Sequence, residues 1–109
     1  MAINYASEKF SSVIYSIVTS AVVESPQDRV YSAALGTHTL CREDFTPELW
    51  MRFERFQSVV TRIPNEKEGS FRASANALSD LEAHDLLVEF YSLAQDVEEE
   101  YRSTFASKA

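Results

Sequence analysis

Residues 79–105 carry the pattern that most restricts the fold of this chain. Apolar side chains recur there every three or four residues and, at about 100° per residue, occupy one stripe roughly 100° wide on a helical wheel. Ser79 followed by Glu82 is a capping-box signal for a helix start. The pattern predicts a long amphipathic helix whose apolar side packs on the rest of the chain. Its apolar stripe comprises Ala83, Leu86, Leu87, Phe90, Ala94, Val97 and Tyr101.

The opposite side of this predicted helix is acidic. Residues 79–105 contain eight acidic residues and one basic residue, Arg102, a balance of −7, while the other nine acidic and nine basic residues cancel. The whole formal net charge of −7 is therefore located on this helix. Because an acidic surface repels phosphate backbones, we expect no direct binding of nucleic acid. The acidic side comprises Glu82, Asp85, Glu89, Asp96, Glu99 and Glu100.

The remaining sequence predicts further helices and no sheet. With only two Gly and three Pro in 109 residues, the chain lacks the turn residues of a many-stranded fold. The length suits one helical domain spanning residues 1–109. We expect an all-α fold, a compact bundle of about four helices over residues 5–24, 26–35, 47–62 and 79–105. A mobile loop is expected near 64–77, with one helical turn around 71–78.

The predicted helix at 5–24 has an unusual second side. Its β-branched run would also suit a strand, but a lone strand would have no partner strand, so we favour a helix. No charge occurs between Lys9 and Glu24, and small uncharged residues suggest that a second helix, from this chain or another copy, covers this side. Its predicted buried side is Phe10, Val13, Ile14, Ile17, Val18 and Ala21, and the uncharged side is Ser12, Ser16, Thr19 and Val23.

Two more helix starts are marked by capping residues. Ser25 and Pro26 suit the cap and first position of a short helix, for which Gly36 is a left-handed stop. Thr46 and Pro47 mark a third helix. Two residues of that helix, Trp50 on the flank of its apolar stripe and Met51 nearly opposite, belong to types enriched in interfaces. We expect Trp50 to cover the edge of the core and Met51 to be exposed, so both are candidates for self-association.

The sequence predicts neither a catalytic nor a metal site. His38 and Cys41 are three residues apart, but zinc sites usually take four Cys or His ligands and the chain holds one Cys and two His. We interpret Cys41 as a small buried thiol, and His84, which has no Glu three residues before it, as a surface residue. No phosphate-binding or nucleophile motif is present. We therefore expect no enzyme activity, no metal and no cofactor.

Three functional hypotheses follow. The first is a non-enzymatic interaction or accessory protein that self-associates as a dimer, through Ser12, Ser16, Thr19 and Val23 or through Trp50 and Met51. The second is an inhibitor or nucleic-acid mimic whose acidic side binds a basic protein surface. The third, ranked last, is a metal-binding or enzymatic bundle. The longest uncharged run, residues 10–23, is short of the roughly 20 residues of a membrane span, and MAINYASEK has no secretory pattern. We expect a cytoplasmic protein without membrane contact.

Overall fold

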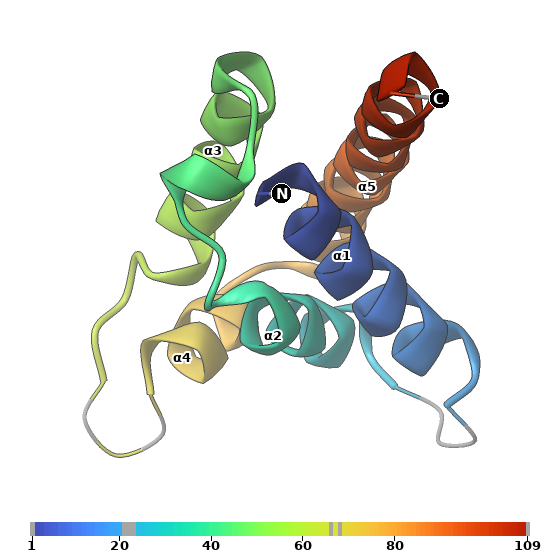
Figure 1. The fold of residues 1–109 in the computed structure, drawn as a ribbon. Helices are drawn as coiled ribbons and strands as arrows, with labels where there is room; N and C mark the ends of the chain where they lie inside the picture. Colours follow the sequence, from blue (N-terminus) through green and yellow to red (C-terminus); the bar gives the residue numbers. More distant parts are fainter. Residues whose placement is uncertain (1, 21–23, 66, 68, 109) are drawn as a thin grey trace.

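The long C-terminal helix is the axis of the molecule. The computed structural model describes residues 2–20, 24–65, 67 and 69–108, with side chains between 3 and 104. Helix α5 (Asp80–Lys108) has 29 residues, which is about 43 Å at 1.5 Å per residue. The longest dimension of the molecule is 46 Å, so α5 spans nearly all of it. Figure 1 shows α5 rising from the base of the molecule, with α1 packed against it and α3 leaning away on the other side.

The start of α5 is fixed by the predicted capping box. The Ser79 hydroxyl accepts a hydrogen bond from the Glu82 backbone N–H at 3.1 Å, and the Glu82 carboxylate accepts one from the Ser79 N–H at 2.9 Å. These two bonds satisfy backbone donors that a helix start leaves without partners. Hydrogen bonding of the Glu82 carboxylate by the backbone N–H and the side chain of Ser79 also holds the pKa of Glu82 below its ordinary value.

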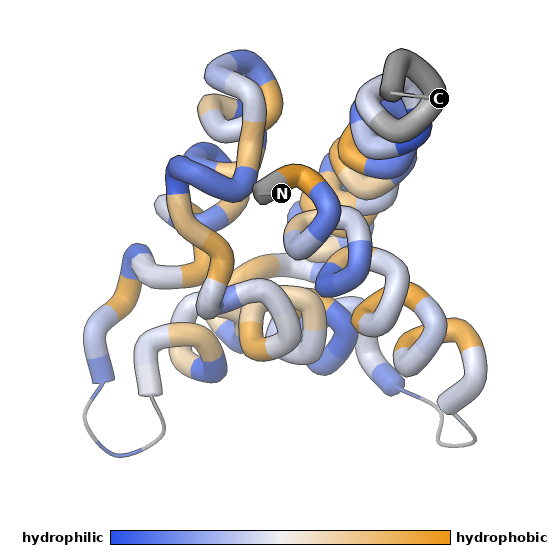
Figure 2. Tube along the Cα trace, in the orientation of Figure 1, coloured by the Kyte–Doolittle hydropathy of each residue, from blue (hydrophilic) through white to orange (hydrophobic). Residues whose placement is uncertain are grey.

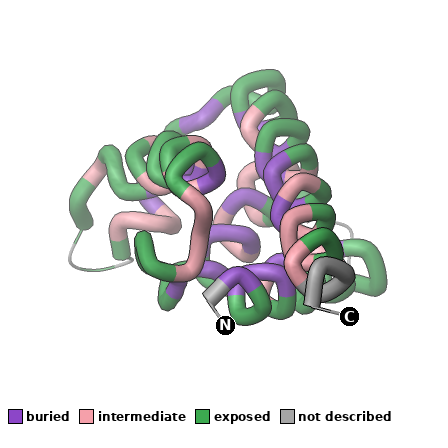
Figure 3. Tube along the Cα trace, turned by 45° about the horizontal axis from the view of Figure 1, so that its top comes forward, coloured by how far each residue is buried: buried purple, intermediate pink, exposed green. Residues whose placement is uncertain are grey.

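The predicted apolar side of α5 is confirmed as its core side. Ala83, Leu87, Phe90, Ala94 and Val97 are buried, while Leu86 and Tyr101 are half-buried and pack on the core. Leu93 is buried as well, which widens the stripe on the side facing α3. Figure 3 shows buried and exposed positions alternating along this helix.

Helix α1 (Ala2–Val18) is shifted toward the N-terminus relative to the predicted range of 5–24. Its buried side begins at Ile3 and Ala6 and continues through Phe10, Val13 and Ile17. At the end of the helix, the Thr19 hydroxyl and N–H both donate to the Tyr15 carbonyl, at 2.7 and 3.0 Å. The prediction that Val18 is buried is wrong, since Val18 is 74% exposed. The predicted core residue Ala21 lies outside the described residues.

Helix α2 (Pro26–Thr37) begins as predicted but ends differently. Ser25 and Asp28 form a capping box, with the Asp28 N–H donating to the Ser25 hydroxyl at 3.1 Å. Gly36 is not a left-handed stop, because it lies inside the helix and has no positive φ. A Cβ at this position would lie 2.1 Å from Cγ2 of Val13, so Gly36 is there to let α1 and α2 approach closely.

An aromatic core joins the helices between the base and α5. After a short 3₁₀ turn, η1 (Arg42–Asp44), helix α3 (Pro47–Val60) buries Leu49, Phe53, Phe56 and Val60. The Phe90 ring lies 5.0 Å from each of the Phe10 and Phe56 rings, measured between centroids, and so links α5 to α1 and α3. Helix α3 ends at Val60 and not at the predicted residue 62.

The segment predicted as a mobile loop contains a further helix, α4 (Ser70–Asn76). Its Ser74 hydroxyl accepts a hydrogen bond from the Ile63 N–H at 2.9 Å. Its Arg72 donates to the Asp28 carboxylate at 2.7 Å and stacks over the Tyr31 ring at 3.9 Å. These contacts hold α4 beside α2 across the base in Figure 1. The all-α prediction is confirmed, but the described residues form five α-helices and not about four.

Candidate functional site

The acidic side of α5 is present but is not one continuous row of free carboxylates. Of the six predicted partner-binding residues, Glu82, Asp85, Glu89 and Glu99 are exposed, whereas Asp96 and Glu100 are half-buried. Glu82 caps its own helix. Asp96 is paired with Arg52 of α3. Two of the six carboxylates therefore already have a structural role.

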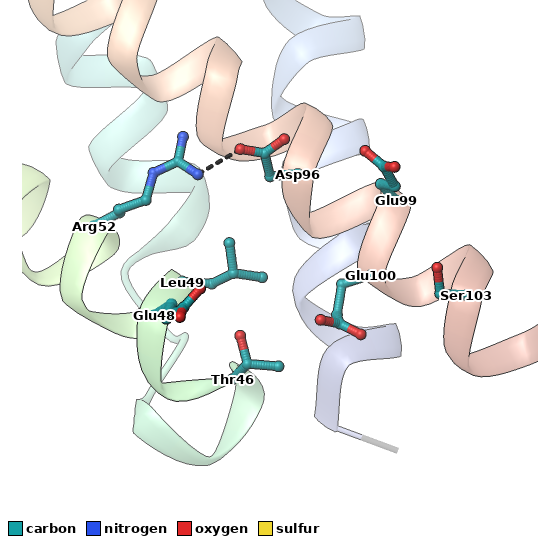
Figure 4. A pocket seen from close by; sticks show the side chains of 8 residues that line it. All are labelled: Thr46, Glu48, Leu49, Arg52, Asp96, Glu99, Glu100 and Ser103. Atoms are coloured by element: carbon teal, nitrogen blue, oxygen red, sulfur yellow. Dashed lines mark hydrogen bonds and ion pairs between the residues drawn. The ribbon is translucent and has the colours of Figure 1, made fainter.

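A cleft of about 360 Å³ lies between the first turn of α3 and the C-terminal half of α5. Figure 4 shows the Arg52–Asp96 ion pair crossing one end of it, and Glu100 extending from α5 toward α3. Arg52 also donates to the Ser92 hydroxyl at 3.3 Å, which holds the guanidinium in place. The cleft is lined by Thr46, Glu48, Leu49, Arg52, Asp96, Glu99, Glu100 and Ser103.

The electrostatic character of this cleft is negative. Asp96 neutralises Arg52, and the ion pairs of the described residues include none of Glu48, Glu99 and Glu100. The structure thus brings Asp96, Glu99 and Glu100 together, whereas Glu82, Asp85 and Glu89 do not line the cleft. The sequence interpretation did not predict that Glu48 and Arg52 line this cleft, because their position depends on how α3 packs against α5.

The uncharged side of α1 is exposed to solvent. Ser12, Ser16 and Thr19 are exposed, so no described part of this chain covers them. Val23, the fourth predicted residue, lies outside the described residues. Tyr15 and Val18, which are 71% and 74% exposed, add large apolar surface beside the small residues. In Figure 2 the hydrophilic colour ends midway along α1, and its second half is pale or orange.

A groove of about 290 Å³ runs beside this surface, between α1 and α5. Phe10 and Ile14 of α1 and Tyr91 and Ala94 of α5 give it apolar walls. Burial raises the pKa of the Tyr91 phenol. The groove therefore continues the uncharged exposed surface of α1 into a half-buried apolar depression.

The side chains of the adjacent residues Trp50 and Met51 lie on different sides of α3. The Trp50 ring is half-buried and lies 5.9 Å from Phe45 and 6.0 Å from Phe53 between centroids, at the edge of the core as predicted. Met51 is 58% exposed, which confirms its predicted exposure. Since most of the Trp50 ring is used by the core, this pair offers less free apolar surface than the outer side of α1.

Cys41 and the two histidines do not form a common centre. Cys41 is exposed, so its interpretation as a buried thiol is wrong. Hydrogen bonding to the Glu43 and Asp44 carboxylates raises the pKa of the thiol to about 11, which keeps it protonated and a poor nucleophile at neutral pH. His38 Nδ1 lies 2.7 Å from the Leu35 carbonyl oxygen, and His84 is exposed on α5. Within the described ranges, no three His, Cys, Asp or Glu residues are grouped as a metal site.

Comparisons with known proteins identify no relative of this chain. No protein-family model, no curated protein and no solved structure matches it. Among the described residues, none of the helices combines the length and the apolar character needed to cross a membrane.

Proposed function

We propose that this chain is a non-enzymatic interaction protein that self-associates as a dimer through the outer side of α1. The observation that carries this proposal is the exposure of Tyr15 and Val18, at 71% and 74%, on a stretch of helix without charges. Aromatic side chains such as that of Tyr15 are enriched in protein interfaces. Burying apolar surface away from water contributes a favourable free energy of roughly 25 cal/mol per Å². Covering this side would remove that apolar surface from water.

The charge distribution favours α1 over the other exposed apolar residues as the place where two copies meet. Each copy carries a formal net charge of −7, which opposes association unless the contacting surfaces are free of like charges. Leu81 and Val88 are also exposed, but they lie on α5 among carboxylates such as Asp85. The second half of α1 brings no carboxylate to the contact.

The proposal is tested by measuring mass and by placing one charge on the surface. Sedimentation equilibrium at micromolar concentration is expected to give twice the 12.4 kDa of one chain. Ser16→Lys should shift the protein to monomer, because two lysines would be buried opposite each other. Ser58→Lys, an equivalent change at an exposed position of α3, should leave the dimer unchanged. A monomer in the wild type, or a dimer in both variants, contradicts the proposal.

A second candidate function is supported by the acidic cleft. Glu48 joins Glu99 and Glu100 around a space with no unpaired described cation, which suits the lysine or arginine side chains of a basic protein. In this alternative the chain is an inhibitor or nucleic-acid mimic that occupies a basic surface. This is the weaker candidate, because two of the six acidic residues already have structural roles: Glu82 caps α5 and Asp96 pairs with Arg52.

The second candidate has its own test. Binding of a fluorescent lysine-rich peptide should weaken severalfold in Glu99→Gln/Glu100→Gln. The control is Glu8→Gln/Glu54→Gln, which removes the same charge from exposed positions outside the cleft. Equal binding by the two double variants would show that only net charge attracts the peptide, and the cleft would have no specific role.

A further inference from the structure

We propose that the two copies are joined by reciprocal insertion, with Tyr15 of each chain entering the groove between α1 and α5 of the other. This inference rests on the self-association proposed above and specifies how it is achieved. It assigns two parts to the interface, a protruding aromatic side chain and an apolar receptor for it.

The groove has the chemistry that a tyrosine ring requires. The half-buried Ile14 and Tyr91 offer apolar and aromatic contacts, and the buried Phe10 and Ala94 also line the groove. Ser11 and Gln95 at the rim can exchange hydrogen bonds with the phenol hydroxyl. A tyrosine placed there would bury its ring while keeping its polar end satisfied, the usual requirement for a buried tyrosine.

The positions of Tyr15 and the groove suit a two-fold arrangement. Tyr15 follows the rim residue Ser11 by four residues, so it stands one helical turn along the same side of α1. Each copy therefore presents its protruding ring directly beside its own groove. A two-fold axis between two such surfaces pairs each ring with the opposite groove, which is the self-complementary contact of a closed dimer.

The charge of the groove agrees with a second copy as the occupant. Among the described residues that line the groove, Glu98 is the one acidic residue, and it is paired with Arg102 at 2.8 Å. The groove consequently offers no free charge to select a basic or acidic partner. An uncharged surface with a protruding aromatic ring fits it, and the outer side of α1 is such a surface.

Complementation between two variants tests the reciprocal geometry. Tyr15→Ser removes the ring but keeps the groove, whereas Ser11→Arg blocks the groove but keeps the ring. Both positions are exposed, so the fold should be retained, which circular dichroism and thermal melting would verify. Each variant alone should dimerise at least about tenfold more weakly than the wild type, since tyrosine is among the dominant residues of interfaces.

Mixing the two variants should produce a heterodimer. The ring of the Ser11→Arg chain can enter the intact groove of the Tyr15→Ser chain, which restores one of the two contacts. Native mass spectrometry of the mixture, with one chain ¹⁵N-labelled, should show heterodimers in excess of both homodimers. Leu35→Ser, at an apolar position of α2 that is 48% exposed, is the matched control and should dimerise as the wild type does.

The outcomes separate this inference from the proposed function. If the wild type is a dimer that Ser16→Lys dissociates, but Tyr15→Ser dimerises as tightly as the wild type, only the reciprocal insertion is wrong. Absence of heterodimers in the mixture overturns it as well. If the wild type is a monomer, both the proposed function and this inference fail.

Discussion

Gly36 is a residue whose type suggests a turn but whose role in the structure is to allow close packing of two helices. Glycine after a short apolar helix is a common stop signal, yet here the helix continues through it to Thr37. The position requires glycine because Cγ2 of Val13 occupies the space that a Cβ would need, at 2.1 Å. Sequence pattern alone cannot distinguish these two reasons for a glycine.

Gly36→Ala is expected to destabilise the protein. Replacing glycine by alanine in a helix interior normally raises the free energy of unfolding by up to about 1 kcal/mol. Overpacking of a tight contact lowers it by about 1–3 kcal/mol. We expect the clash to prevail, with a net loss of about 1–2 kcal/mol in urea unfolding. Combining the change with Val13→Ala should show a favourable coupling between the two positions. A stabilised Gly36→Ala variant would mean that α1 and α2 do not approach this closely.

Phe90→Ala is expected to be one of the most damaging core substitutions. The ring is 1% exposed and lies between Phe10 of α1 and Phe56 of α3, so its loss leaves a cavity where three helices meet. We expect a loss of about 3–5 kcal/mol in the free energy of unfolding. Glu99→Ala, on the exposed side of the same helix, should change it by less than about 0.5 kcal/mol. The reverse order in chemical denaturation would mean that α5 is turned the other way.

The residues of the candidate surfaces were only partly predictable. The uncharged side of α1 is evident in the sequence because no charge interrupts residues 10–23. The exposure of Val18 was not predicted, because periodicity assigned it to the core while the helix ends there. The pairing of Arg52 with Asp96, 44 residues away, left no sequence signal, because it depends on the packing of α3 against α5.

At the scale of elements, the sequence located the helix starts that a Ser or Thr marks, including that of α3 after Thr46, although the Thr46 side chain makes no capping hydrogen bond. Ser25 and Ser79 each form a capping box, and α2 and α5 begin directly after them. Helix α4 lacks such a signal, because its N-cap is Gly69 with a positive φ of 84°. Its buried residues Ala73, Ser74 and Ala75 are small and give no apolar periodicity. Its place depends on tertiary contacts to Ile63 and Asp28.

The capping box of α5 should make stability depend on acidic pH. Hydrogen bonds from Ser79 hold the pKa of Glu82 below its ordinary value of 4.5. A carboxyl group with a lowered folded-state pKa stabilises the fold above its ordinary pKa and loses that contribution as pH falls through the folded value. The contribution of Glu82 is therefore complete at neutral pH and is lost as the pH falls below 4.5 and through the lowered pKa of the folded state.

Glu82→Gln measures this contribution without deleting the cap, since glutamine also serves in a capping box. We expect the variant to be less stable than the wild type at pH 7, with the difference in free energy of unfolding closing between pH 5 and pH 3. Urea titrations at half-unit pH intervals provide the measurement. Parallel curves over that range would show that Glu82 does not stabilise the helix start through its charge.

For the whole molecule, the separation of charge from apolar surface is the dominant feature. The excess negative charge lies on α5, whereas the second half of α1 exposes Tyr15 and Val18 on a stretch without charged residues. Composition and charge could be read from the sequence. The arrangement that leaves the α1 side exposed beside a groove could not, since it depends on which helices pack together.

Salt dependence should separate the two candidate functions. Contacts between uncharged surfaces of like-charged molecules gain from screening, so raising NaCl from about 0.05 to 0.5 M should leave the dimer unchanged or tighten it by up to about threefold. Binding of a lysine-rich peptide to the acidic cleft should weaken by at least about tenfold over the same range. Sedimentation and fluorescence anisotropy give the two dissociation constants. A dimer that dissociates on adding salt would point to charged contacts.

The most direct test of self-association through α1 is an isotope-filtered NOE experiment on a mixture of ¹³C-labelled and unlabelled chains. Only contacts between different molecules give signals in such a spectrum. We predict NOEs from the Tyr15 ring of one copy to the Ile14 methyl groups and the Tyr91 ring of the other. A dimeric sample with intermolecular NOEs confined to α3 or to the acidic side of α5 would contradict self-association through α1, whereas NOEs between α1 helices without a contact from Tyr15 to Tyr91 would contradict only the reciprocal insertion.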